Sequence, residues 1–87
     1  DIGILPVLRT LTHLPIMVDP SHPAGNFRYV PSYAKMAVAS GSDGLIVEIH
    51  PDPANALSDG AQSLTFSDFH RMMADLKPLA QVCDRKI

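Results

Sequence analysis

Two short apolar stretches decide the fold of this chain: LPIMVD at residues 14–19 and GLIVEI at residues 44–49. Each is a nearly continuous apolar run, a pattern typical of strands that are buried on both faces of a parallel sheet. The first run stops at the turn signal Asp19-Pro20. Because consecutive parallel strands need a crossover connection, we predict a right-handed βαβ unit.

The segments outside these two strands favour helices. Apolar residues within 3–12 are spaced for one face of a short helix. Residues 31–40 begin with a proline that suits the first turn of a helix, and Gly41 is expected to stop it. Thr65 caps the last predicted helix, which Pro78 is expected to end or bend. The predicted order is therefore helix, strand, helix, strand, helix.

The size of the chain indicates that this unit is incomplete. With 87 residues, of which 46% are hydrophobic and 18% charged, it fits one small domain or a piece of a larger one. It opens at Asp1 without an initiator Met, which we interpret as the middle of a longer protein. Two parallel strands cannot close a core, because strands apolar throughout need neighbours on each side. We expect a segment of a larger parallel sheet or barrel.

The composition also excludes several classes of partner. A formal net charge of -2 offers no attraction to nucleic acid or to anionic lipid. No apolar run is long enough to span a membrane, and no signal peptide is recognisable. The single cysteine, Cys83, cannot form an internal disulfide, and we interpret it as an ordinary thiol rather than a ligand. These features predict a cytoplasmic protein.

Three potential metal ligands follow or end the predicted strands: His22, Glu48 and Asp59. In parallel α/β proteins ligands bind at the carboxyl ends of the strands, so these residues are expected to converge. One imidazole with two carboxylates favours Mn, Fe, Co or Zn over Ca or Mg. His50 is a further candidate, either as a ligand or beside one, whereas His13 and His70 are expected at the surface.

Each ligand assignment has a simpler alternative. A single loop histidine such as His22 is more often exposed or hydrogen-bonded than bound to metal. Glu48 interrupts an apolar strand, so its charge needs either a metal or an arginine or lysine beside it. Asp59 precedes Gly60 in the long loop at 50–64, where an Asp-Gly pair serves to form a turn.

Two longer motifs carry a family resemblance: LPIMVDPSHPAG at residues 14–25 and DGLIVEIHPDPANALSDGAQSL at 43–64. The chain resembles the C-terminal part of 3-deoxy-D-arabino-heptulosonate 7-phosphate (DAHP) synthases, in the subfamily related to 3-deoxy-D-manno-octulosonate 8-phosphate synthase. The resemblance implies that residues 1–87 are a fragment of a (β/α)8 TIM barrel, an α/β fold. They would supply its last two strands with the surrounding helices.

The resemblance implies an enzyme that condenses phosphoenolpyruvate with erythrose 4-phosphate, the first step of the shikimate pathway. Family members hold a divalent metal through Cys, His, Glu and Asp, and the last three match His22, Glu48 and Asp59. The Cys ligand belongs to an earlier part of the barrel and has no match here. After the first motif many relatives carry a basic pair, whereas this chain has Asn26-Phe27-Arg28, which leaves Arg28 as a candidate substrate contact beside His50.

Three other readings stay open. An octulosonate synthase would use arabinose 5-phosphate in place of erythrose 4-phosphate. The isolated 87 residues could be a catalytically inactive α/β fragment that only self-associates through its strand edges. A free-standing metal-binding module is the third. For the intact enzyme we expect a homo-oligomer, with no nucleic acid or membrane partner.

Overall fold

The computed structural model describes all 87 residues. Its helices and strands are α1 (Ile4–Leu11), β1 (Met17–Val18), α2 (Ser21–Ala24), α3 (Val30–Ala39), β2 (Gly44–Leu45) and α4 (Phe66–Val82), with the 3-10 helices η1 (Phe27–Tyr29), η2 (Pro53–Asn55) and η3 (Gly60–Gln62). The predicted order of the main elements is confirmed. The short helix α2 and the 3-10 helices lie in segments that were expected to be loops.

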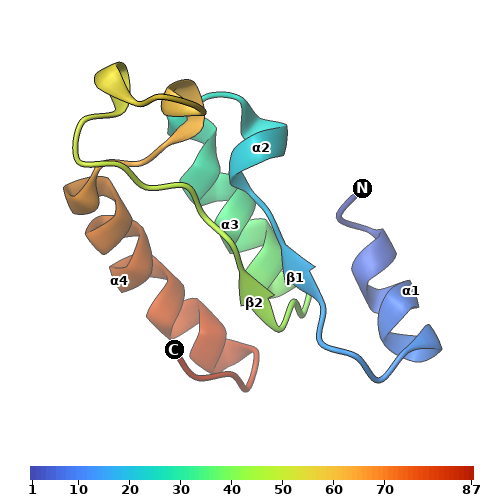
Figure 1. Cartoon of the computed structure of the whole chain (residues 1–87). Coiled ribbons are helices and arrows are strands. Elements are labelled where there is room, and N and C mark those ends of the chain that lie inside the picture. Colours follow the sequence, from blue (N-terminus) through green and yellow to red (C-terminus); the bar gives the residue numbers. More distant parts are fainter.

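The two strands form a parallel pair, as predicted (Figure 1). Val18 lies opposite Leu45, and the Ile46 amide donates a hydrogen bond of 2.9 Å to the Val18 carbonyl. Both strands are much shorter than the predicted runs 14–19 and 44–49. The reason is that the sheet has only two strands, so the outer edge of each has no neighbour to continue the ladder.

Beyond β2 the chain continues extended and meets a distant segment. The Leu64 amide donates to the Glu48 carbonyl, and the His50 amide donates to the Leu64 carbonyl, both at 2.9 Å. Ile49 and Leu64 thereby form an isolated parallel bridge. This bridge returns the end of the long loop to the extension of β2.

The hydrophobic core lies between α3 and α4, with the β2 segment packed against it (Figure 1). Its buried members are Val30, Ala34, Val38, Leu64, Met72, Leu76 and Ala80. Leu45 and Val47 pack against this cluster, whereas Ile46 between them is 62% exposed. The strand therefore has one face against the core and one exposed face, so the burial on both faces that its apolar run favours is not present in this chain. Glu48 falls on the face opposite the core.

The helix ends agree with the sequence signals. Pro31 occupies the first turn of α3, and Gly41 follows its last turn with a φ of 91°, a left-handed conformation that glycine adopts without strain. At the start of α4 the Asp68 amide donates to the Thr65 hydroxyl at 3.1 Å, which is the predicted cap.

Pro78 does not end the last helix, which runs on to Val82. Proline lacks the amide that would bond one turn back, so an interruption at this position was one expected outcome. Leu76 and Ala80, on either side of Pro78, are both buried in the core. Their packing offsets the missing hydrogen bond and keeps the helix continuous.

Helix α1 lies apart from the α3–α4 core, on the β1 side of the molecule (Figure 1). Only Leu5 of this helix is buried. The Arg9 guanidinium connects it to the rest of the chain, through hydrogen bonds of 2.9 Å to the Gly41 carbonyl and 2.7 Å to the Asp43 carboxylate. No helix of the chain is both long and apolar enough to cross a membrane.

Candidate metal centre

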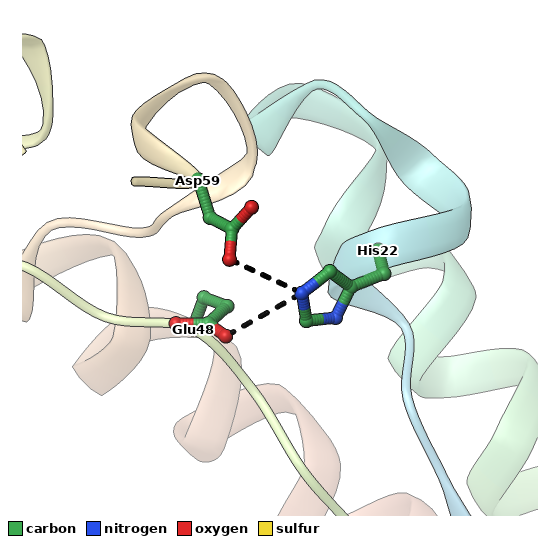
Figure 2. A group of neighbouring side chains, drawn as sticks. All are labelled: His22, Glu48 and Asp59. Carbon is green, nitrogen blue, oxygen red and sulfur yellow. Dashed lines mark hydrogen bonds and ion pairs between the residues drawn. The ribbon is translucent and has the colours of Figure 1, made fainter. Parts of the chain in front are cut away.

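The three predicted ligands converge beyond the carboxyl ends of the strands (Figure 2). His22 lies on α2 after β1, Glu48 lies on the extension of β2, and Asp59 directly precedes η3. His22 Nε2 is 3.2 Å from Asp59 Oδ2 and 3.6 Å from Glu48 Oε1. One potential ligand atom from each residue lies within 4.8 Å of the others. We call these three residues the acidic cluster.

A tight turn fixes the direction of the His22 side chain. Asp19 Oδ1 accepts hydrogen bonds from the Ser21 amide at 2.8 Å and from the His22 amide at 3.0 Å. Asp19 Oδ2 contacts His22 Nδ1. With Nδ1 donating to a carboxylate, the lone pair of a neutral imidazole is on Nε2, the atom that faces Glu48 and Asp59.

The carboxylates around His22 shift its ionisation. Hydrogen bonds first to Asp19 and then to Asp59 raise the pKa of the His22 imidazole. Partial burial opposes ionisation of Asp19, but hydrogen bonds from the His22 amide and imidazole and from the Ser21 amide lower the pKa of Asp19 overall. The imidazole therefore carries a proton more readily when no other cation balances the carboxylates.

Hydrogen bonds fix the backbone of Glu48, whereas its carboxylate forms no hydrogen bond. The Ser21 hydroxyl accepts from the Glu48 amide at 2.9 Å, and the Glu48 carbonyl accepts from Leu64. The carboxylate pairs with His22, and no arginine or lysine lies within ion-pair distance of it. Within these 87 residues no arginine or lysine balances this charge, and the His22 imidazole is the basic group beside it.

Asp59 both forms a turn and belongs to the acidic cluster, although the sequence favoured these two roles as alternatives. Its φ of 57° is left-handed, a conformation that aspartate tolerates better than most residues. The Ser63 hydroxyl donates to the Asp59 carbonyl at 2.8 Å. A Cβ on Gly60 would stand 2.3 Å from the Pro53 carbonyl oxygen, so only glycine fits after Asp59 without movement of the loop.

The donor set fits a divalent transition metal. Zinc bonds to imidazole nitrogen and carboxylate oxygen are about 2.0–2.2 Å, so ligand atoms of one ion lie about 3–4.4 Å apart. The two separations from His22 Nε2, 3.2 and 3.6 Å, fall in this range. Nitrogen and carboxylate ligands together suit Mn, Fe, Co or Zn. Three protein ligands leave room for a further one.

The two candidate substrate contacts do not touch the acidic cluster. His50 Nδ1 accepts a hydrogen bond of 2.9 Å from the Asp52 amide, so its ring is engaged within its own loop. The Arg28 guanidinium lies 5.8 Å from the centre of the Phe27 ring. It borders a groove of ≈ 230 Å³ that includes no residue of the cluster. Their role in substrate binding stays a prediction.

Two residues next to the cluster support its ligands, and only the first of them, through the turn signal Asp19-Pro20, is indicated by the sequence. They are the Asp19 carboxylate, which orients His22, and the buried Ser21 hydroxyl, which holds Glu48. The signal for Asp19 is local, because an aspartate side chain that accepts hydrogen bonds from the amides two and three residues later forms a turn. The hydrogen bond between Ser21 and Glu48 joins segments far apart in the sequence, so no local pattern predicts it.

A parallel strand pair with packed helices and a potential metal centre beyond its carboxyl ends is typical of a segment of a parallel α/β sheet or barrel. The family model described as "DAHP synthetase I family" matches residues 1–83. The chain belongs to this family.

Individual relatives agree with this assignment. The phospho-2-dehydro-3-deoxyheptonate aldolase of Thermotoga maritima is 45% identical over 87 residues, covering 100% of this chain and 26% of the relative. The 2-dehydro-3-deoxyphosphooctonate aldolase of Legionella pneumophila is 36% identical, covering 94% of this chain and 34% of the relative. The chain thus spans about a quarter to a third of the length of these relatives.

Solved structures match the fold closely. The crystal structure of the DAHP synthase from Thermotoga maritima has a TM-score of 0.95 at 45% identity, over 99% of this chain and 25% of that one. A truncated form of the same organism's enzyme gives the same score and identity, with 33% of its chain covered. The fold of these 87 residues is that of one segment of an α/β-barrel synthase.

Proposed function

We propose that the protein carrying this chain is a metal-dependent DAHP synthase, which condenses phosphoenolpyruvate with erythrose 4-phosphate and releases phosphate. This reaction is the first step of the shikimate pathway. The observation that carries the proposal is the acidic cluster: a histidine and two carboxylates converge within 4.8 Å in a member of the DAHP synthetase I family. The heptonate product is favoured over the octonate because identity is 45% to the heptonate relative and 36% to the octonate relative.

Each residue of the cluster has a defined part in this proposal. His22 Nε2, Glu48 Oε1 and Asp59 Oδ2 would hold a divalent ion, whose chemistry is Lewis-acid polarisation of the aldehyde carbonyl. Asp19 keeps the proton of the imidazole on Nδ1, so that Nε2 remains a ligand.

We further propose that residues 1–87 are the C-terminal segment of the barrel and that they are inactive alone. Both outer strand edges support this, because each borders an apolar groove. The groove beside β2 and α4 measures ≈ 710 Å³, and the groove between α1, β1 and α3 measures ≈ 610 Å³. Unpaired strand edges with apolar surroundings are covered in stable folds. Turnover by the purified 87-residue chain would contradict this part of the proposal.

A matched pair of loop aspartates tests the proposed function in the intact protein. Asp59→Asn removes a charged ligand, whereas Asp52→Asn alters an exposed aspartate of the same loop outside the cluster. We expect Asp59→Asn alone to weaken Mn²⁺ binding in calorimetry and to abolish phosphoenolpyruvate consumption with erythrose 4-phosphate. Equal losses in both variants, or full activity in a metal-free wild type, would overturn the proposal.

The octulosonate reaction is the second candidate, and the relative from Legionella pneumophila favours it. Both reactions use phosphoenolpyruvate, so the acceptor sugar decides between them. The intact protein should consume phosphoenolpyruvate with erythrose 4-phosphate and not with arabinose 5-phosphate. The opposite preference would replace the heptulosonate proposal with the octulosonate one while leaving the metal site in place.

A further inference from the structure

Ser21 has an unusual place beside the acidic cluster. Its side chain is fully buried, with an exposure of 0%, directly before the exposed His22. Its hydroxyl accepts the hydrogen bond from the Glu48 amide at 2.9 Å. A buried hydroxyl costs free energy unless it is hydrogen-bonded, so this contact stabilises the backbone arrangement at the site.

This bond takes over where the strand ladder ends. The last ladder bond between the two strands runs from the Ile46 amide to the Val18 carbonyl. Beyond it, the next amide of the same strand edge, that of Glu48, is bound by a side chain instead of a backbone carbonyl. Ser21, which directly precedes His22, is thus hydrogen-bonded to the backbone of Glu48, a residue far away in the sequence.

A second buried serine acts in the same way on the third ligand. Ser63 is 3% exposed, and its hydroxyl donates to the Asp59 carbonyl at 2.8 Å. The next residue, Leu64, donates its amide to the Glu48 carbonyl at 2.9 Å. The backbones of Glu48 and Asp59 are therefore linked through residues 63 and 64, as those of His22 and Glu48 are linked through Ser21.

We propose that Ser21 and Ser63 are positioning residues that set the separations within the acidic cluster before a metal binds, which rests on the proposed metal-dependent function. Each acts through a ligand backbone and contacts no ligand atom itself. Preorganisation of this kind lowers the cost of assembling one imidazole and two carboxylates around one ion. Outer contacts of metal ligands typically contribute about 10–100-fold to metal affinity.

Ser42 provides a matched control, because it is also a buried serine, with an exposure of 8%, but its hydroxyl has no hydrogen-bond partner. The experiment measures Mn²⁺ affinity by calorimetry in the intact protein for the wild type, Ser21→Ala, Ser63→Ala and Ser42→Ala. We expect about 10-fold weaker binding or more for the first two variants, in line with other outer contacts of metal sites. Ser42→Ala should bind like the wild type. Wild-type affinity in both Ser21→Ala and Ser63→Ala would overturn the proposal.

Amide hydrogen exchange without metal separates this inference from the proposed function. The Glu48 amide should be protected in the wild type and in Ser42→Ala, and should exchange faster in Ser21→Ala. A wild type that binds no Mn²⁺ but shows this pattern would contradict the metal-dependent function and still support the role of Ser21. A Glu48 amide that exchanges freely in the wild type would overturn the positioning role even if Ser21→Ala failed to fold.

Discussion

The two ends of the β1–β2 pair hold aspartate or glutamate side chains in opposite surroundings. At the amino end, Asp43 accepts hydrogen bonds from Arg9 at 2.7 Å, from Arg85 at 2.8 Å and from the Ile16 amide at 2.8 Å. At the carboxyl end, the Glu48 and Asp59 carboxylates have no arginine or lysine in ion-pair contact, and the His22 imidazole is the only basic group that they pair with.

The number of basic partners distinguishes Asp43, a carboxylate with a structural role, from the potential metal ligands Glu48 and Asp59. Donation from the Ile16 amide, and then from the Arg9 side chain, lowers the pKa of Asp43 to about 2. The Asp43 carboxylate has its hydrogen-bond partners within the chain. Through Arg9, the Ile16 amide and Arg85 it connects α1, the starts of both strands and the C-terminal residues. The carboxylates of the cluster share one imidazole and have no other basic group in ion-pair contact within this chain. An excess of converging carboxylates at the carboxyl ends of parallel strands is what a cation site needs.

The largest expected effect comes from removing a ligand at the carboxyl end. Glu48→Gln keeps the size of the side chain and its backbone bonds to Ser21 and Leu64. A catalytic metal supplies several kcal/mol, so synthase activity of the intact protein should fall about 10³-fold or more. Calorimetry should show a matching loss of Mn²⁺ affinity. Asp43→Asn, the counterpart at the amino end, should keep the wild-type affinity, and equal losses in both would remove the distinction between the two ends.

A smaller effect is expected from moving a ligand without changing it. In Gly60→Ala the new Cβ would meet the Pro53 carbonyl at 2.3 Å, so the loop that carries Asp59 must shift. Mn²⁺ affinity should fall, by less than in Glu48→Gln. Gly3→Ala is the control, since its Cβ would meet only the Asp1 carboxylate at 3.2 Å. Unchanged affinity in Gly60→Ala would show that the position of Asp59 is not set by this turn.

Much of this arrangement follows from local sequence. The apolar runs at 14–19 and 44–49 indicate two parallel strands, and parallel strands bring their carboxyl ends together. Burial of these strands on both faces is not present in this chain, where Met17 is 59% and Ile46 62% exposed. The cap at Thr65 and the glycine at Gly41 also act within a few residues, which is why both predictions are confirmed. Local chemistry singles out Glu48, because glutamate is rare in an apolar strand. For His22 and Asp59 it favours simpler interpretations, and the ligand assignment rests on the family resemblance.

Other features depend on contacts that no local pattern contains. The continuation of α4 through Pro78 depends on burial of its neighbours in the core. The bond from Ser21 to Glu48 and the pairing of Asp43 with Arg9 and Arg85 join segments distant in sequence. From residue types alone, Asp43 could not be separated from a ligand, because the difference lies in which cations the fold brings to it.

At the amino end, the main expected effect is on stability. Asp43→Asn loses two ion pairs and keeps no charge to hold Arg9 and Arg85. We expect a melting temperature several degrees below that of the wild type, measured by circular dichroism without metal. Asp75→Asn is the matched control: it breaks the exposed pair with Lys35, and exposed pairs contribute little. Equal melting temperatures for the two variants would show that the Asp43 network is no more than a surface pair.

The smallest effect is a change of stability with pH that should come from the amino end. A carboxylate whose pKa is lower in the folded chain contributes stability above its unfolded pKa and loses it as pH falls through the folded value. For Asp43 these limits are the ordinary value of 3.8 and about 2. The difference in free energy of unfolding between wild type and Asp43→Asn should therefore be constant above pH 5 and shrink towards pH 2. The lowered pKa of Asp19 affects both proteins equally and cancels in this difference. A difference that stays constant down to pH 2 would mean that the arginines and the Ile16 amide do not stabilise the ionised form of Asp43.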